Sequence, residues 1–213
     1  MTTDTAAGTA LSLYLVGLAG TFGLRAWAHR RRTGSSGFRG FTGAPGTPAW
    51  WGGVLFLVAL LLGAAGPALA ATGLVVPPTV VPTGTAWAGV GLAVLGFAGV
   101  VAAQSGMGSS WRVGVDASER TDLVTTGPFA VARNPVFTAM CTALGGLVLV
   151  VPTVVSVSAL VCLVLAVELQ VRAVEEPYLV GTHGSAYTDY AGKVGRFVPG
   201  VGRLRAASAA GGH

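Results

Sequence analysis

The sequence predicts an all-α integral membrane protein, a helical bundle of about five transmembrane helices, and three observations support this fold class. The chain has 213 residues, of which 52% are hydrophobic and only 10% are charged. Its mean hydropathy is +0.69, so a soluble domain would have to hide far more apolar surface than its size allows. The apolar residues also gather in runs, most of which reach the roughly 20 residues needed to cross a 30 Å hydrocarbon core.

Three of these runs fill the N-terminal half, and we expect each to form one transmembrane helix. The first follows a segment that carries one charge, Asp4, and neither a basic cluster nor a cleavage site, so it is expected to be an anchor rather than a signal peptide. Small residues at four-residue spacing, Gly89 with Ala93 and Ala19 with Gly23, predict close helix packing. The three runs lie at about residues 10–28, 50–76 and 85–107.

A hairpin of two shorter spans is expected next, at about residues 136–151 and 153–171, with Pro152 at its turn. The first of these two runs is short for a membrane crossing. The hairpin would return the charged residues that follow it to the side of the membrane where Arg133 lies.

The basic residues predict the orientation. With five spans and the N-terminus outside, every Arg and Lys falls on or next to the cytoplasmic side, and the predicted outer loops contain none. The C-terminus is then cytoplasmic, and we expect a plasma-membrane protein. The pI near 9.9 follows from this orientation, and no nucleic-acid partner is expected. The basic residues are Arg25, Arg30, Arg31, Arg32, Arg39, Arg112, Arg120, Arg133, Arg172, Lys193, Arg196, Arg203 and Arg205.

The two cysteines, Cys141 and Cys162, lie inside predicted spans, away from any second Cys, His or carboxylate at metal-ligand spacing. We therefore expect them to pack as small apolar side chains. The sequence predicts neither a disulfide nor a metal site.

Charged side chains are expected to meet at the inner end of the hairpin. Arg133 stands at the mouth of a membrane helix, where a charge is costly and indicates function. Glu168, Arg172 and Glu176 are spaced by four residues and could form a ladder of ion pairs. This end is either a solvated helix end, or a cytoplasmic pocket in which Arg133 and Arg172 bind an anionic group and Glu175 or Glu176 accepts hydrogen bonds from hydroxyls or an amine.

The following segment, with Tyr187 and Tyr190, is too polar to span the membrane and predicts a short amphipathic helix. It would either cover the pocket or anchor the C-terminus at the interface. His183, beside Gly184, is expected to be a loop residue rather than a base.

Several motifs follow one another in a fixed order over roughly the C-terminal half. They are Gly127-Pro128-Phe129, Arg133-Asn134-Pro135-Val136-Phe137, a two-helix hairpin, Arg172 with Glu175-Glu176, and Gly184 with Tyr187 and Tyr190. This order resembles the isoprenylcysteine carboxyl methyltransferase and phospholipid methyltransferase superfamily of integral membrane enzymes. Several motifs in one order are more specific than any one of them.

The resemblance implies a methyltransferase that uses S-adenosylmethionine and acts on a small lipophilic or lipid acceptor at the cytoplasmic membrane face. Residues 1–213 would then form one membrane domain, with three spans in 1–107 and a catalytic half in 108–213. The catalytic residues implied are Arg133, Asn134 and Arg172. The residues implied to bind the donor are Gly127, Pro128, Arg133, Asn134, Pro135, Glu175, Glu176, Tyr187 and Tyr190.

Two positions depart from the family pattern: Asn134 stands where the family usually has His, and Phe137 where it usually has Tyr. Asn can donate and accept hydrogen bonds but cannot titrate near neutral pH, which argues against an acid–base role there. Phe137 keeps the ring and loses a hydroxyl.

Two other functions fit parts of the pattern. A membrane sterol or enone reductase that uses NADPH carries a related Arg-His-Pro signature, and a non-catalytic lipid-binding membrane protein could keep the fold after the change at Asn134. The acceptor and the oligomeric state stay open. One Lys against twelve Arg, with abundant Ala, Gly and Val, suggests a high-GC bacterial genome and argues against a protein prenylcysteine as the acceptor.

Overall fold

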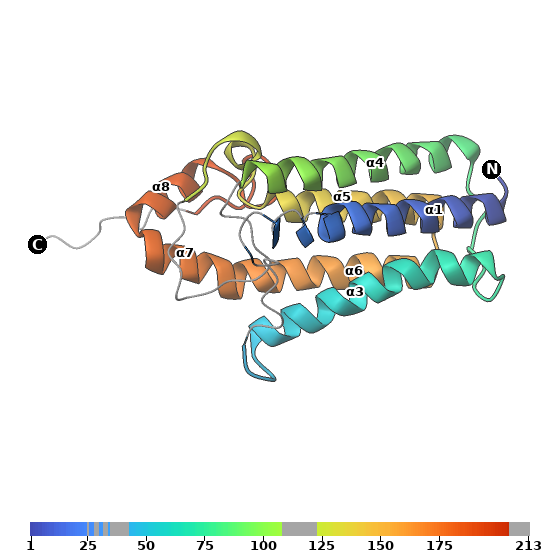
Figure 1. Cartoon of the computed structure of the whole chain (residues 1–213), viewed down its shortest axis with the longest axis horizontal. Helices are drawn as coiled ribbons and strands as arrows, with labels where there is room; N and C mark the ends of the chain where they lie inside the picture. Colours follow the sequence, from blue (N-terminus) through green and yellow to red (C-terminus); the bar gives the residue numbers. More distant parts are fainter. Residues whose placement is uncertain (25, 28–29, 32–33, 35–42, 108–122, 205–213) are drawn as a thin grey trace, which may run out of the picture.

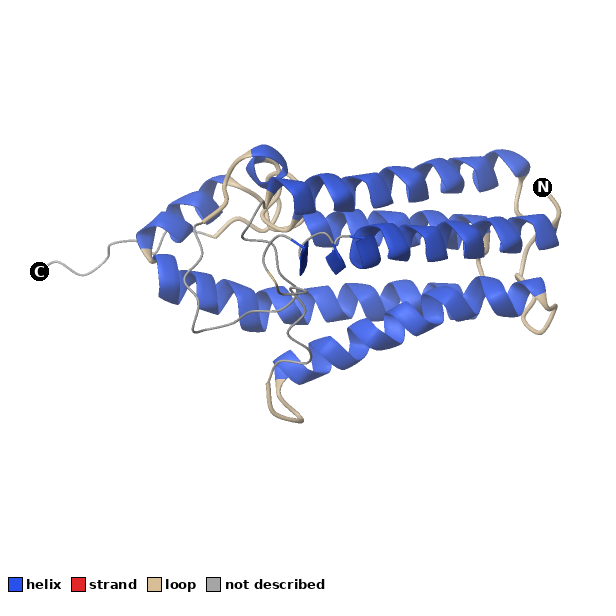
Figure 2. Ribbon diagram, in the orientation of Figure 1, coloured by secondary structure: helices blue, strands red, loops and turns tan. Residues whose placement is uncertain are grey.

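The computed structural model describes residues 1–24, 26–27, 30–31, 34, 43–107 and 123–204, which form an elongated bundle of helices (Figures 1 and 2). The predicted all-α class is confirmed, because the described residues contain helices and a single isolated β-bridge, between Ala132 and Gly195. Six of the basic residues used for the orientation lie outside the described ranges: Arg25, Arg32, Arg39, Arg112, Arg120 and Arg205.

The helices follow the order of the predicted runs. The first half contains α1 (Thr3–Leu18), its π-helical continuation η1 (Ala19–Leu24), α3 (Pro48–Ala71) and α4 (Thr83–Gly106). A 3-10 turn, η3 (Gly127–Ala130), precedes the hairpin of α5 (Pro135–Val150) and α6 (Val154–Gln170). The second hairpin helix runs on through the π-helical η4 (Val171–Glu175) into α7 (Glu176–His183), and α8 (Ser185–Lys193) follows.

Among the residues that the structure describes, four helical stretches are long and apolar enough to cross a membrane: Thr3–Leu24, Pro48–Ala71, Thr83–Gly106 and Val154–His183. The chain is therefore an integral membrane protein by helix length and composition. The remaining predicted span, α5, has 16 residues and is about 24 Å long, shorter than a 30 Å hydrocarbon core.

Side-chain caps explain why some helices begin earlier than predicted. The Thr2 hydroxyl accepts a hydrogen bond from the Thr5 backbone N–H, so the first helix starts at Thr3 rather than near residue 10. Thr47 caps α3 in the same way, with Pro48 at the first helical position. The helix that contains the last predicted span does not end near residue 171 but continues to His183.

The bundle consists of two tightly packed helix pairs, α4 with α5 and α3 with α6, and α1 packs mainly on α3 (Figure 1). A Cβ atom on Gly89 would lie 2.6 Å from the Gly146 carbonyl oxygen, which confirms the predicted small-residue contact of Gly89 and Ala93. The same prediction for Ala19 and Gly23 was wrong, because Ala19 is exposed and a Cβ on Gly23 would meet nothing within 4 Å.

We expect Gly96→Ala to destabilise the protein by about 1–3 kcal/mol, because the new Cβ would lie 2.3 Å from the backbone nitrogen of Ala143 and would push α4 and α5 apart. The midpoint of thermal unfolding in detergent measures this effect. Gly91→Ala is the matched control on the same helix, since a Cβ there meets nothing within 4 Å. Equal midpoints for the two variants would contradict the close approach.

Candidate functional site

The predicted site residues lie at the end of the bundle opposite the N-terminus, where α7, α8 and the residues before α5 come together (Figure 1). The chain after α8, residues 194–204, folds back along the segment before α5; we call it the C-terminal strap. The Arg133 backbone N–H donates to the Gly195 carbonyl oxygen at 2.9 Å, and that of Asn134 donates to the Arg196 carbonyl oxygen at 3.0 Å. Two segments more than 60 residues apart in sequence thus form one wall.

Glu176 is the centre of a buried ion-pair cluster. Arg196 donates from Nε to one carboxylate oxygen and from Nη2 to the other, each at 2.8 Å. Arg133 Nη2 lies 2.8 Å from the first of these oxygens. Such charge-assisted, partly bidentate contacts are the strong kind of hydrogen bond in proteins.

The predicted ladder of Glu168, Arg172 and Glu176 forms only in its first half. Arg172 pairs with Glu168, and the Arg172 side chain is 60% exposed. The π-helical η4 contains Arg172 and ends directly before Glu176, and a π-helix holds more residues per turn than an α-helix. The expected i,i+4 alignment is therefore lost, and Glu176 pairs with Arg133 and Arg196 instead.

The Arg133 side chain has nitrogens that donate no hydrogen bond to the described residues. Its side chain is only 2% exposed, and Nη2 donates to the Gly202 carbonyl oxygen at 2.8 Å besides its contact with Glu176. Nε and Nη1 are buried and have no hydrogen-bond partner among the described residues. Because a buried donor without a partner is costly, these two atoms indicate a place for an anionic ligand.

Two tyrosines of α8 surround this guanidinium. The Tyr187 ring is buried, with the Arg133 guanidinium 5.9 Å from its centroid, and packs edge-on against Tyr190 with 6.2 Å between centroids. Tyr190 donates its hydroxyl to the Phe129 carbonyl oxygen at 2.6 Å, which ties α8 to the Gly127-Pro128 turn. Burial raises the pKa of both tyrosines to about 12, although Arg133 acts in the opposite direction, so both hydroxyls stay protonated at neutral pH.

Asn134 holds the strap. Its side-chain amide donates to the Arg196 carbonyl oxygen at 3.1 Å, and Thr138, one turn further along α5, donates its hydroxyl to the Phe197 carbonyl oxygen at 2.8 Å. The polar atoms at the start of α5 are thus used to fix the strap. Pro135 occupies the first position of α5, where its missing N–H costs nothing.

Glu175 differs from Glu168 and Glu176, the other two carboxylates of the helical stretch Val154–His183. It is half-buried and hydrogen-bonds the Gln170 side chain, and no ion pair to it occurs among the described residues. Glu168 and Glu176, by contrast, each have an arginine.

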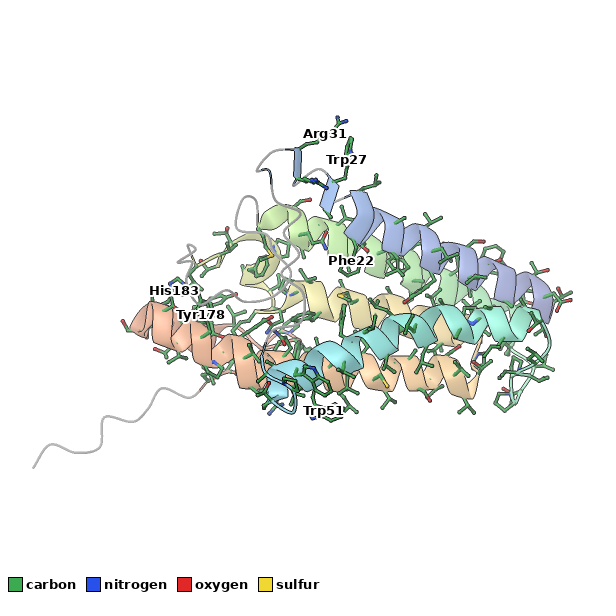
Figure 3. The ribbon with its side chains drawn as sticks, turned by 60° about the horizontal axis from the view of Figure 1, so that its bottom comes forward. Phe22, Trp27, Arg31, Trp51, Tyr178 and His183 are labelled. Atoms are coloured by element: carbon green, nitrogen blue, oxygen red, sulfur yellow. The ribbon has the colours of Figure 1, made fainter. Side chains whose placement is uncertain are left out.

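His183 was predicted to be a loop residue, which was wrong: it is the last residue of α7. Gly184, with φ +54°, ends the helix directly after it. Both His183 and Tyr178 belong to α7, at one end of the elongated molecule (Figure 3).

An apolar cavity of about 30 Å³ lies inside the bundle, and residues of all five long helices line it. The two hydroxyl groups of its lining already donate hydrogen bonds within the protein, Tyr14 to the Leu60 carbonyl oxygen and Thr21 to the Gly17 carbonyl oxygen. Within the described ranges no group of three or more His, Cys, Asp or Glu could hold a metal ion.

The sequence prediction of the site did not include Arg196, Gly195 and Gly202. Arg196 belongs to the polar tail after Tyr190, and a single Arg in such a tail gives no sign of its partner. Gly195 gives only a weak signal, as one glycine of the same tail. Its backbone position requires glycine, because a Cβ there would lie 2.0 Å from the Val198 carbonyl oxygen.

Gly195→Ala is therefore expected to displace the strap and weaken ligand binding at Arg133 several-fold, with little change in the unfolding midpoint of the bundle. Gly192→Ala provides the control, because its Cβ would make an ordinary 3.5 Å contact with the Leu204 carbonyl oxygen. Equal ligand affinity in the two variants would argue against the strap as part of the site.

Comparison with known proteins adds one finding: residues 85–186 match the family model described as phospholipid methyltransferase. The match begins in α4, includes Arg133, Asn134, Glu175 and Glu176, and ends in α8 just before Tyr187. No curated protein matches the chain.

Proposed function

We propose a specific activity from the match of residues 85–186 to the phospholipid methyltransferase family, which lies within a superfamily of integral membrane methyltransferases. The protein transfers a methyl group from S-adenosylmethionine to a small lipophilic or lipid acceptor. The observation that carries the proposal is the buried Arg133 guanidinium with two N–H-bearing nitrogens left open.

The residues present fit the amino-acid end of this donor. The open Nε and Nη1 of Arg133 suit a carboxylate. The Glu175 carboxylate, which has no ion pair among the described residues, suits an ammonium group or ribose hydroxyls. Both oxygens of Glu176 already accept hydrogen bonds from arginine. Glu176 would therefore contribute to the binding of S-adenosylmethionine indirectly, by holding Arg133 in place. Tyr187, Tyr190 and the Gly127-Pro128 turn would shape the remaining surface.

When bound, S-adenosylmethionine supplies an electrophilic methyl group on a sulfonium for in-line displacement by the acceptor. The protein then needs only to hold S-adenosylmethionine and the acceptor in line. Such positioning lowers the activation free energy of a reaction by up to about 7–11 kcal/mol. No activated protein nucleophile is required. Arg172, exposed beside Glu168, stays a candidate for an anionic group of the acceptor.

We place the site on the cytoplasmic face of the plasma membrane, with five crossings and the N-terminus outside. Two features support this orientation. The Met1 ammonium contacts Thr83 at the end of the bundle opposite Arg133 and Arg196, where the basic residues gather. Trp27, with Arg31 stacked on it, and Trp51 are exposed near the same level, as aromatic anchors of a membrane interface are (Figure 3).

The apolar cavity supports a lipophilic acceptor, since its lining offers no open polar group to a ligand. A hydrocarbon end group would fill it without leaving a donor or acceptor unpaired. The nature of the methylated atom does not follow from this lining.

Isothermal titration of the detergent-purified protein tests the proposal. S-adenosylmethionine and S-adenosylhomocysteine are titrated first, and NADPH is titrated in parallel. We expect micromolar binding of the first two alone. Binding of NADPH alone would instead indicate a membrane reductase, and no binding of any of the three would indicate a non-catalytic lipid-binding protein.

A further inference from the structure

We propose that Arg196 is a positioning residue that keeps Arg133 open for its ligand, although Arg196 does not itself contact that ligand. The inference rests on the proposed function, because it names what prepares the same site. Its basis is the unequal way in which two arginines share the Glu176 carboxylate.

Arg196 occupies both oxygens of Glu176 through Nε and Nη2, in the fork geometry that guanidinium and carboxylate groups favour. Arg133 reaches only one of these oxygens, and only through Nη2. The same Nη2 also donates to the Gly202 carbonyl oxygen. Among the described residues, the polar contacts of the Arg133 side chain therefore all go through Nη2, which leaves its other two nitrogens open.

Without Arg196, this arrangement would not last. A buried carboxylate beside a guanidinium gains most from a two-point contact, so Glu176 would rotate and accept from a second nitrogen of Arg133. That contact would occupy one of the two open nitrogens of Arg133, which the ligand needs. Arg196 prevents it because it holds both carboxylate oxygens in their present orientation.

The backbone around Arg196 is fixed well enough for this role. Its N–H donates to the Val201 carbonyl oxygen at 2.8 Å, and its own carbonyl oxygen accepts from both the backbone and the side chain of Asn134. The hydrogen bond with Glu176 raises the pKa of Arg196 above its usual value, so the guanidinium stays charged throughout any practical pH range. The strap thus presents a permanently charged fork to Glu176.

A double-mutant cycle with S-adenosylhomocysteine as the probe tests this role. Arg196→Ala is expected to weaken binding about fivefold in the wild-type background, and less than twofold in the Glu176→Gln background, because the competing carboxylate is then absent. An equal loss in both backgrounds would mean that Arg196 acts only by holding the strap, and would overturn the inference.

Two further variants sharpen the cycle. Arg196→Lys keeps the charge but not the fork, so we expect a loss of about two- to threefold, between wild type and alanine. Arg203→Ala removes an exposed arginine of the same strap and should leave the affinity unchanged. A loss for Arg203→Ala as large as that for Arg196→Ala would point to general electrostatic attraction and also overturn the inference.

One measurement needs neither S-adenosylmethionine nor S-adenosylhomocysteine, so it tests the role of Arg196 independently of the proposed function. With ¹⁵N-labelled arginine, the side-chain N–H resonances of Arg133 are compared in the wild type and in Arg196→Ala. A downfield proton shift in the variant is expected, because a new hydrogen bond to Glu176 forms; unchanged resonances would overturn the inference even if the wild type binds no S-adenosylhomocysteine.

Discussion

Arg133→Ala should weaken binding of S-adenosylhomocysteine at least tenfold, a loss of about 1.4 kcal/mol, and should abolish measurable methyl transfer. The variant removes both open nitrogens proposed to bind the donor carboxylate, and it leaves the Gly202 carbonyl oxygen without this donor. Isothermal titration gives the affinity, and a radiolabelled methyl-transfer assay gives the activity.

Two controls separate this effect from a change in charge or in the C-terminal region. Arg133→Lys should not restore affinity, because one ammonium cannot serve Glu176, Gly202 and a ligand together. His183→Ala should leave the affinity nearly intact, since His183 lies at the far end of α7 (Figure 3). A large loss in His183→Ala would mean that the tail contributes more to binding than we propose.

Glu176→Gln has the second large expected effect. It leaves the buried guanidinium of Arg133 and the half-buried guanidinium of Arg196 without their carboxylate, and removing one partner of a buried ion pair typically costs about 3–5 kcal/mol. We expect donor affinity to fall at least tenfold and the unfolding midpoint to fall as well. Unchanged affinity in both Glu176→Gln and Arg133→Ala would contradict our assignment of the site.

The matched control for Glu176→Gln is Asp189→Asn, which removes an exposed carboxylate from α8. It changes the net charge of the protein by the same amount. We expect its affinity and its unfolding midpoint to equal those of the wild type.

Much of the fold could be predicted because membrane helices are long, apolar and bounded by turn residues. The runs near α3 and α4 were located within a few residues at most ends, and the shortness of α5 was visible in its sequence. The extension of α6 to His183 was not, because the charges at Arg172, Glu175 and Glu176 suggest a helix end although the helix continues past them.

That several candidate site residues meet was predictable from the sequence, but their contacts were not. Arg133, Glu176, Tyr187 and Tyr190 do come together, as the ordered motifs indicated. The partners of Glu176 were not predictable from helical spacing, because η4 changes the register by its π-helical geometry. The pairing of Arg196 with Glu176 was not predicted for a different reason: this contact spans 20 residues and depends on the fold of the strap.

The central claim is that the open nitrogens of Arg133 bind the carboxylate of the methyl donor. Its most direct test is the affinity of S-adenosylhomocysteine and of its decarboxylated analogue for the wild type and for Arg133→Ala. We predict that loss of the carboxylate weakens binding to the wild type at least tenfold and binding to Arg133→Ala less than twofold. Equal losses in the two proteins would show that the carboxylate binds elsewhere and would contradict the claim.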